Sequence, residues 1–212
     1  MTGWDVIVVG SGPGGAVVAD RLTAQGARVL VLEEGPRIGP GEVGDFSPEQ
    51  MRRAYRGGGL TGAVGRPAVA YAEARCVGGG SEVNAGLYHR PPRELLERWR
   101  AVAVPDLDLD EVEQACRRVE ADLAVTARPG GPAPAGLVLA RGAQRLGWAW
   151  EDVPRWLGGD HPQARRGMSS TLLARAEAAG AVVRAGDQVV AVRHERGRAT
   201  GVRVRQQDGT IV

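Results

Sequence analysis

The chain has 212 residues, which is enough for one complete hydrophobic core or for one domain and part of a second. Its formal net charge is +2, so no strong attraction to nucleic acid is expected. No apolar run approaches the roughly 18 residues that a transmembrane helix needs, so no membrane-spanning segment is expected either. All 27 basic residues are arginine, which indicates codon bias rather than a binding device.

Two cysteines, Cys76 and Cys116, do not have a metal-ligand spacing, and the sequence predicts no metal site. We expect both to be reduced thiols in a cytoplasmic protein, while a disulfide between them stays open. The first apolar run begins close to Met1, so no signal peptide is expected.

The N-terminal stretch has the order strand, glycine turn, helix, strand and acidic residue. An apolar run, Val6 to Val9, ends in a glycine-rich turn, and residues 14–25 follow as a predicted helix. A second apolar run, Val29 to Leu32, ends in two glutamates. This order is typical of a dinucleotide-binding βαβ unit, and the alternative is a plain βαβ turn without a ligand.

The glycines and the acid each have a physical reason in that motif. Gly10 permits the tight turn, Gly12 lets the backbone approach a pyrophosphate, and Gly15 lets the helix pack on the sheet. The free N–H groups at the helix start favour phosphates. Glu33 follows at close to the roughly 20-residue spacing expected of a ribose-binding carboxylate, which also disfavours the 2′-phosphate of NADP. The motif alone does not separate NAD from FAD.

A second glycine cluster follows an irregular stretch and a short helix expected from Ser47 to Tyr55. The cluster, residues 78–80, removes side chains from a backbone that something must approach closely. Ser81 and Asn84 are polar neighbours, and apolar residues around them favour a packed segment. From the residues alone, both a ligand-facing loop and a flexible surface loop stay open.

Residues 74–97 resemble the first signature of the glucose-methanol-choline (GMC) flavoprotein oxidoreductases. The pattern is a small residue, Arg, any residue, an aliphatic residue, Gly-Gly, two small residues, any residue, an aliphatic residue, Asn, and then an aromatic residue and Pro. The matching residues are Ala74, Arg75, Val77, Gly78, Gly79, Gly80, Ser81, Val83, Asn84, Tyr88 and Pro91. The resemblance implies FAD as cofactor and an α/β fold: a Rossmann-like FAD-binding domain with inserted helices and a β-meander, incomplete relative to the family.

The resemblance also implies which residues contact FAD. The pyrophosphate and ribose would be bound by the glycine turn and the acids, the flavin side by the second loop, and the adenine by a valine after a short turn. The implied contacts are Gly10, Ser11, Gly12, Gly15, Glu33, Glu34, Arg75, Gly78, Gly79, Ser81, Asn84, Leu87 and Val189. Some family members attach FAD to a histidine in this loop; the sequence GGGSEVN has none, so noncovalent FAD is predicted.

The rest of the chain reads as helices followed by strands. Helices are expected at 93–103, from Asp108 to Leu123, at 137–146 and, with N-caps from Ser169 to Thr171, up to Ala179. Trp148, Trp150 and Trp156 form either a substrate-pocket wall or packing under a loop. Strands are predicted at 181–185, 189–194 and 200–205. We therefore divide the chain into a FAD-binding part (1–92), a helical substrate-side part (93–167) and a return to the FAD-binding part (168–212).

No catalytic residue is assigned within this chain. His89, His161 and His194 match no catalytic position, and family members carry their catalytic histidine in a later portion. We expect the FAD-binding portion of an enzyme that oxidises a small-molecule alcohol by hydride transfer to flavin, with the base on a possible second chain that carries the C-terminal half. The alternatives are a truncated FAD-binding protein without activity and a nucleotide-binding interaction module.

Overall fold

The computed structural model describes residues 3–127, 131–158 and 165–212, so His161 lies outside the described residues. The chain divides into two compact units. The first comprises Met1–Asn84 and Gly167–Val212, and the second comprises Ala85–Arg166. The second unit is thus inserted in the first, and it begins before residue 92, where the sequence placed the first boundary.

A three-stranded parallel sheet forms the centre of the first unit, in the order β1-β2-β5. Its strands are β1 (Val6–Val9), β2 (Val29–Glu33) and β5 (Val182–Ala185). All five residues of the central strand β2 are buried, as expected for a parallel sheet covered on both faces.

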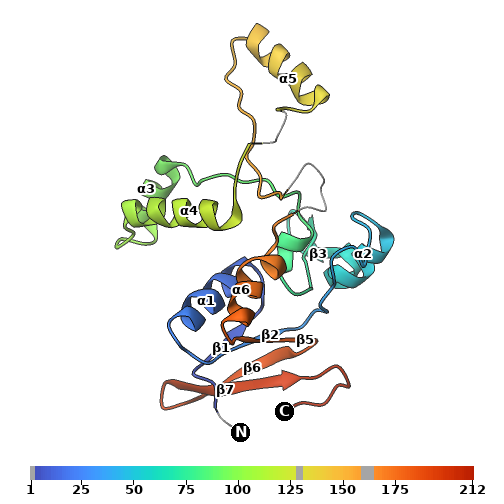
Figure 1. The fold of residues 1–212 in the computed structure, drawn as a ribbon, viewed down its shortest axis with the longest axis vertical. Coiled ribbons are helices and arrows are strands. Elements are labelled where there is room, and N and C mark those ends of the chain that lie inside the picture. Colours follow the sequence, from blue (N-terminus) through green and yellow to red (C-terminus); the bar gives the residue numbers. More distant parts are fainter. Residues whose placement is uncertain (1–2, 128–130, 159–164) are drawn as a thin grey trace. The chain divides into compact units, whose positions relative to one another are not determined.

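The side chains of β2 alternate between the two faces of the sheet. Val29 and Val31 pack with Ala19 and Ala176 beneath α1 (Pro13–Ala24) and α6 (Leu172–Ala178). Leu30 and Leu32 pack on the opposite face against Val204 and its neighbours in the hairpin of β6 (Gln188–Glu195) and β7 (Arg198–Arg205). The sheet therefore lies between a helix pair and a β-hairpin (Figure 1).

The described part of the first unit has six further short elements. They are α2 (Pro48–Ala54), η1 (Arg56–Gly59), β3 (Thr61–Ala63), β4 (Val69–Tyr71), η2 (Gly79–Glu82) and η4 (Met168–Ser170). As predicted, Ser47 caps α2, its Oγ accepting a hydrogen bond from the Gln50 N–H at 3.0 Å.

Three helices form most of the described second unit: α3 (Arg93–Val102), α4 (Leu109–Leu123) and α5 (Pro134–Arg145). Asp108 caps α4 as predicted, because its Oδ1 accepts from the N–H groups of Asp110 and Glu111 at 2.9 and 3.0 Å. Of the three tryptophans expected to form a pocket wall or to pack under a loop, Trp148 and Trp150 are 68% and 47% exposed, so these two do not pack under a loop. Trp156 is partly buried.

The predicted fold class, a Rossmann-like α/β fold, is confirmed, and so is the pairing of the two C-terminal strands. The predicted side-chain cap of α6 is wrong: no side chain caps this helix, because the Thr171 hydroxyl donates instead to the Gly167 carbonyl at 2.7 Å. Short hydroxyl side chains often bond to nearby backbone in this way.

Candidate functional site

The glycine turn between β1 and α1 is shaped by backbone geometry. Gly10 has φ +87°, a left-handed conformation that favours glycine, and its N–H donates to the Leu32 carbonyl at 2.8 Å. Helix α1 begins at Pro13, and no side chain caps its N-terminus. The first N–H groups of α1 therefore face outward at the positive end of the helix dipole, which suits an anion.

One further glycine of the turn and one of the second glycine cluster allow backbone to touch backbone. A Cβ on Gly15 would lie 2.0 Å from the Gly10 carbonyl oxygen and 3.2 Å from Val8 Cγ1. A Cβ on Gly79 would lie 2.7 Å from the Cα of Gly12. The turn and the second glycine loop (residues 75–82) are thus in direct contact. Glycine is therefore needed at these positions partly for packing within the protein and not only for a ligand.

Glu33 ties the turn, the end of β2 and the second loop together. Its buried carboxylate accepts hydrogen bonds from the Ser11 N–H at 3.0 Å, from the Ser11 Oγ at 2.7 Å and from the Gly35 N–H at 2.9 Å. The Ser11 hydroxyl in turn accepts from the Gly78 N–H at 3.0 Å. A ribose hydroxyl would share this carboxylate with the turn, since two carboxylate oxygens offer about four acceptor sites.

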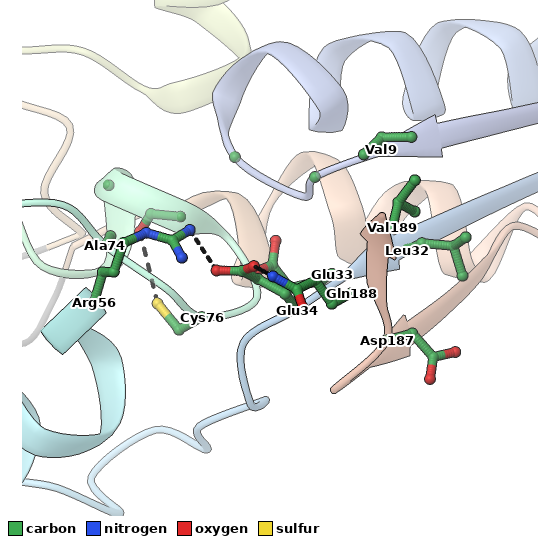
Figure 2. A pocket seen from close by; sticks show the side chains of 14 residues that line it. Val9, Leu32, Glu33, Glu34, Arg56, Ala74, Cys76, Asp187, Gln188 and Val189 are labelled. Atoms are coloured by element: carbon green, nitrogen blue, oxygen red, sulfur yellow. Dashed lines mark hydrogen bonds and ion pairs between the residues drawn. The ribbon is translucent and has the colours of Figure 1, made fainter. Parts of the chain in front are cut away.

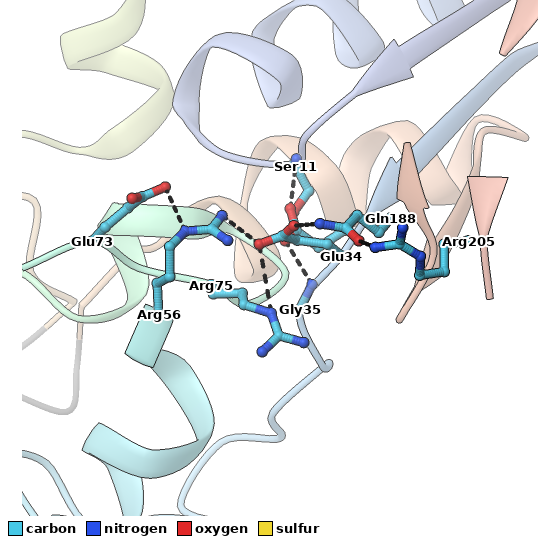
Figure 3. A network of polar contacts seen from close by, with 9 residues as sticks. Ser11, Glu34, Gly35, Arg56, Glu73, Arg75, Gln188 and Arg205 are labelled. Atoms are coloured by element: carbon cyan, nitrogen blue, oxygen red, sulfur yellow. Dashed lines mark hydrogen bonds and ion pairs between the residues drawn. The ribbon is translucent and has the colours of Figure 1, made fainter. Parts of the chain in front are cut away.

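Glu34 is the centre of a polar network that joins four segments (Figure 3). Its carboxylate forms ion pairs with Arg56 and, at 3.5 Å, with Arg75, and it accepts from the Gln188 amide at 3.0 Å. Arg56 also pairs with Glu73 at 3.0 Å, and this contact is the main reason that the pKa of Arg56 is raised. The network links the end of β2 to η1, the second loop and β6.

A hollow of about 370 Å³ lies over the glycine turn (Figure 2). It is lined by Val9, Gly10, Gly12, Leu32, Glu33, Glu34, Arg56, Ala74, Cys76, Gly79, Gly80, Asp187, Gln188 and Val189. Burial, reinforced by the carboxylates of Glu82 and Glu33, raises the pKa of the Cys76 thiol to about 12. The thiol is therefore protonated at neutral pH.

The structure brings many of the predicted site residues together. Six of them line the hollow, namely Gly10, Gly12, Glu33, Glu34, Gly79 and Val189. Four lie around it: Ser11, Gly15 and Gly78 in the turn and loop, and Ser81, which is buried. Arg75 lines an adjacent hollow of about 510 Å³, and Asn84 is exposed. Leu87 belongs to the second unit, so its place at the site stays a prediction.

Sequence reasoning missed four residues that shape this site. A Cβ on Gly35 would lie 2.3 Å from the Arg75 carbonyl carbon, so the second loop crosses directly over the end of β2. Arg56 and Gln188 line the hollow, and the Glu82 carboxylate lies against Gly78. Only Gly35 had a local signal, because a glycine directly after the two acids indicates a close approach.

The geometry fits a dinucleotide. The open helix start suits a pyrophosphate, the buried acid at the end of β2 suits a ribose, and Val189 lies across the hollow at the start of β6. Within residues 3–127, 131–158 and 165–212, no group of three or more acidic, histidine or cysteine residues could hold a metal ion. No helix in the same ranges is long and apolar enough to span a bilayer.

These features define a Rossmann-type dinucleotide-binding protein. Residues 51–212 match the family described as "GMC oxidoreductase", and residues 8–55 match "NAD(P)-binding Rossmann-like domain". The chain is 37% identical over 215 residues to the uncharacterized GMC-type oxidoreductase y4nJ of Sinorhizobium fredii, covering 96% of this chain and 43% of the relative. It is 34% identical over 152 residues to the long-chain-alcohol oxidase FAO3 of Arabidopsis thaliana, covering 71% of this chain and 20% of that protein.

Solved structures show the same fold. Pyridoxine 4-oxidase from Mesorbium loti matches with a TM-score of 0.74 and 17% identity, covering 99% of this chain and 48% of that one. An FAD-dependent oxidoreductase from Chaetomium thermophilum matches with a TM-score of 0.74 and 19% identity, covering 99% of this chain and 43% of that one.

This chain belongs to the GMC oxidoreductase family. The predicted family and its cofactor, FAD, are thereby confirmed, while noncovalent attachment stays a prediction. The chain spans less than half the length of these relatives.

Proposed function

We propose that this chain is the FAD-binding portion of an alcohol-oxidising flavoenzyme, and that it binds FAD noncovalently in the hollow over the glycine turn. One observation carries the proposal: the turn after β1 and the second glycine loop, far apart in the sequence, meet backbone to backbone at Gly12 and Gly79. Their contact forms one wall of a hollow that also contains the acidic end of β2.

In this proposal, the chain's own residues bind and orient the cofactor. The N–H groups at the start of α1 take the pyrophosphate, and the carboxylate of Glu33 takes a ribose hydroxyl. Glu34 is already shared among two arginines and an amide, so it holds the rim of the site in place. Bound FAD would supply the hydride-accepting flavin ring, which is the chemistry that this chain lacks by itself.

The substrate class is an alcohol oxidised at its CH–OH carbon. The similarity to a protein named as a long-chain-alcohol oxidase supports this class. Removal of the hydroxyl proton needs a general base, and no histidine lines the described hollow over the glycine turn. We therefore expect the base outside the residues that line this hollow, and we propose a separate polypeptide that completes the enzyme as its source.

The first experiment measures FAD binding by the purified chain. Titration with FAD, followed by flavin fluorescence and absorbance, should give saturable binding at one equivalent. NADP should bind much more weakly because the acids at the end of β2 repel a 2′-phosphate. Absence of FAD uptake would refute the proposal.

Two further observations test the mode of attachment and the partner. After acid precipitation the flavin should stay in the supernatant; flavin that sediments with the protein would refute noncovalent binding. A second polypeptide with a base should co-purify from the native source and restore alcohol oxidation when it is added. An FAD-loaded chain that is active without any partner would refute the separate-chain proposal.

A further inference from the structure

Glu82 joins two segments that are far apart in the sequence. Its Oε1 accepts a hydrogen bond from the Ser169 N–H at 3.0 Å, and its Oε2 accepts from the Ser169 Oγ at 2.8 Å. Next to it, the buried Ser81 Oγ accepts from the Met168 N–H at 2.9 Å and donates to the Gly78 carbonyl at 2.8 Å. The second glycine loop is thus bonded to the start of η4.

The same carboxylate occupies space that two glycines leave open. A Cβ on Gly78 would lie 2.1 Å from Glu82 Oε1, and a Cβ on Gly167 would lie 2.4 Å from the same oxygen. Gly167 has φ −64° and ψ 168°, which any residue can adopt. Its lack of a side chain is therefore explained by the Glu82 carboxylate and not by its backbone.

The other end of the same loop touches the glycine turn. The Gly78 N–H donates to Ser11 Oγ at 3.0 Å, and Gly79 lies against Gly12. A continuous set of contacts therefore runs from Ser169 through Glu82 to the wall of the hollow. The family pattern leaves the Glu82 position unconstrained, so the resemblance assigns this residue no role.

We infer that Glu82 is a positioning residue for the cofactor: its carboxylate clamps the loop of residues 78–82 to residues 167–169 and so holds Gly78 and Gly79 against the glycine turn. The clamp acts through the loop and does not touch the cofactor itself. This inference rests on the proposed function, because its consequence is tighter FAD binding.

The test measures FAD affinity by titration of the whole chain and compares single variants with a double variant. Glu82→Ala should weaken FAD binding roughly 10-fold or more, since hydrogen bonds to a charged group are lost. Glu82→Gln keeps an acceptor for the Ser169 N–H, so it should stay within about 3-fold of the wild type. Glu195→Ala, at the exposed end of β6, is the matched control and should change nothing.

Gly167→Ala separates a clamp from a merely destabilising change. In the wild type, the added methyl group should displace the carboxylate and weaken FAD binding about as much as Glu82→Ala. In the Glu82→Ala background the methyl group has room, so the double variant should bind FAD no more weakly than Glu82→Ala alone. Equal binding by Glu82→Ala and wild type, or additive losses in the double variant, would overturn the inference.

Hydrogen exchange of the cofactor-free chain gives a readout that does not need FAD. The Ser169 amide should exchange roughly 10-fold faster in Glu82→Ala than in the wild type or in Glu82→Gln. If the wild type binds no FAD, the proposed function fails while this measurement still decides whether the clamp exists. If Glu82→Ala does not fold, Ser169→Ala replaces it, with an expected loss of roughly 5-fold in FAD affinity; unchanged affinity would count against the clamp.

Discussion

Replacing Gly15 by alanine tests whether α1 depends on direct contact with the glycine turn. The added Cβ would lie 2.0 Å from the Gly10 carbonyl oxygen, far inside ordinary van der Waals contact, so α1 or the turn must shift. Overpacking of this kind costs about 1–3 kcal/mol. The neighbouring Gly14 is the matched control, because a Cβ there meets no atom within 4 Å.

Both substitutions share the gain of about 0.5–1 kcal/mol that alanine has over glycine in a helix. Gly14→Ala should therefore stabilise the chain, and Gly15→Ala should be about 1–3 kcal/mol less stable than Gly14→Ala. Urea unfolding of the cofactor-free chain, followed by circular dichroism, measures this difference. Equal stability of the two variants would refute the view that Gly15 is needed for packing rather than for the ligand.

Further predictions concern the α1–α6 ion pair and the buried thiol. Arg175 holds the buried Asp20 carboxylate by two hydrogen bonds of 2.6 and 2.7 Å, so Arg175→Met should lower the free energy of unfolding by about 1.5–3 kcal/mol. Adding Asp20→Leu to this variant should restore part of the lost stability. If the losses from the two substitutions simply add, the pairing is contradicted. Cys76, with its pKa raised to about 12, should be alkylated far more slowly than Cys116 at pH 8.5, as mass spectrometry would show; equal rates would contradict its burial. The Cys76 thiol ionises near pH 9 in the unfolded chain and near pH 12 in the folded chain. The free energy of unfolding should therefore fall by up to about 1.4 kcal/mol per pH unit between these values. In Cys76→Ala, the free energy of unfolding measured by denaturation from pH 8 to 11 should fall less steeply with pH. If the pH dependence is unchanged, it comes from other groups and not from Cys76.

The βαβ unit could be predicted from the sequence because its determinants are local. The glycines of the turn and the acid after β2 lie within one short stretch, and each is required by backbone geometry that the spacing itself reveals. The same holds for the caps of α2 and α4, where a side chain bonds to a backbone N–H three residues away.

The contacts around the hollow could not be predicted, because they join residues remote in the sequence. Glu82 and Ser169 are 87 positions apart, and Glu34 and Gln188 are 154 positions apart. Nothing in the local sequence pairs such residues; the chain path brings them together. The missing cap of α6 has a different cause, because the Thr171 hydroxyl had two possible backbone partners and bonded to the Gly167 carbonyl.

The hydrogen bond between Ser81 and Met168 also has a consequence for how this chain can vary. It joins the residues just before the chain enters the second unit to the residues just after the chain leaves it. An insertion that departs and returns at one fixed point can change in length, or be exchanged for another, without redirecting the polypeptide on either side. We therefore expect that a short linker in place of residues 85–166 leaves the Rossmann-type unit able to fold.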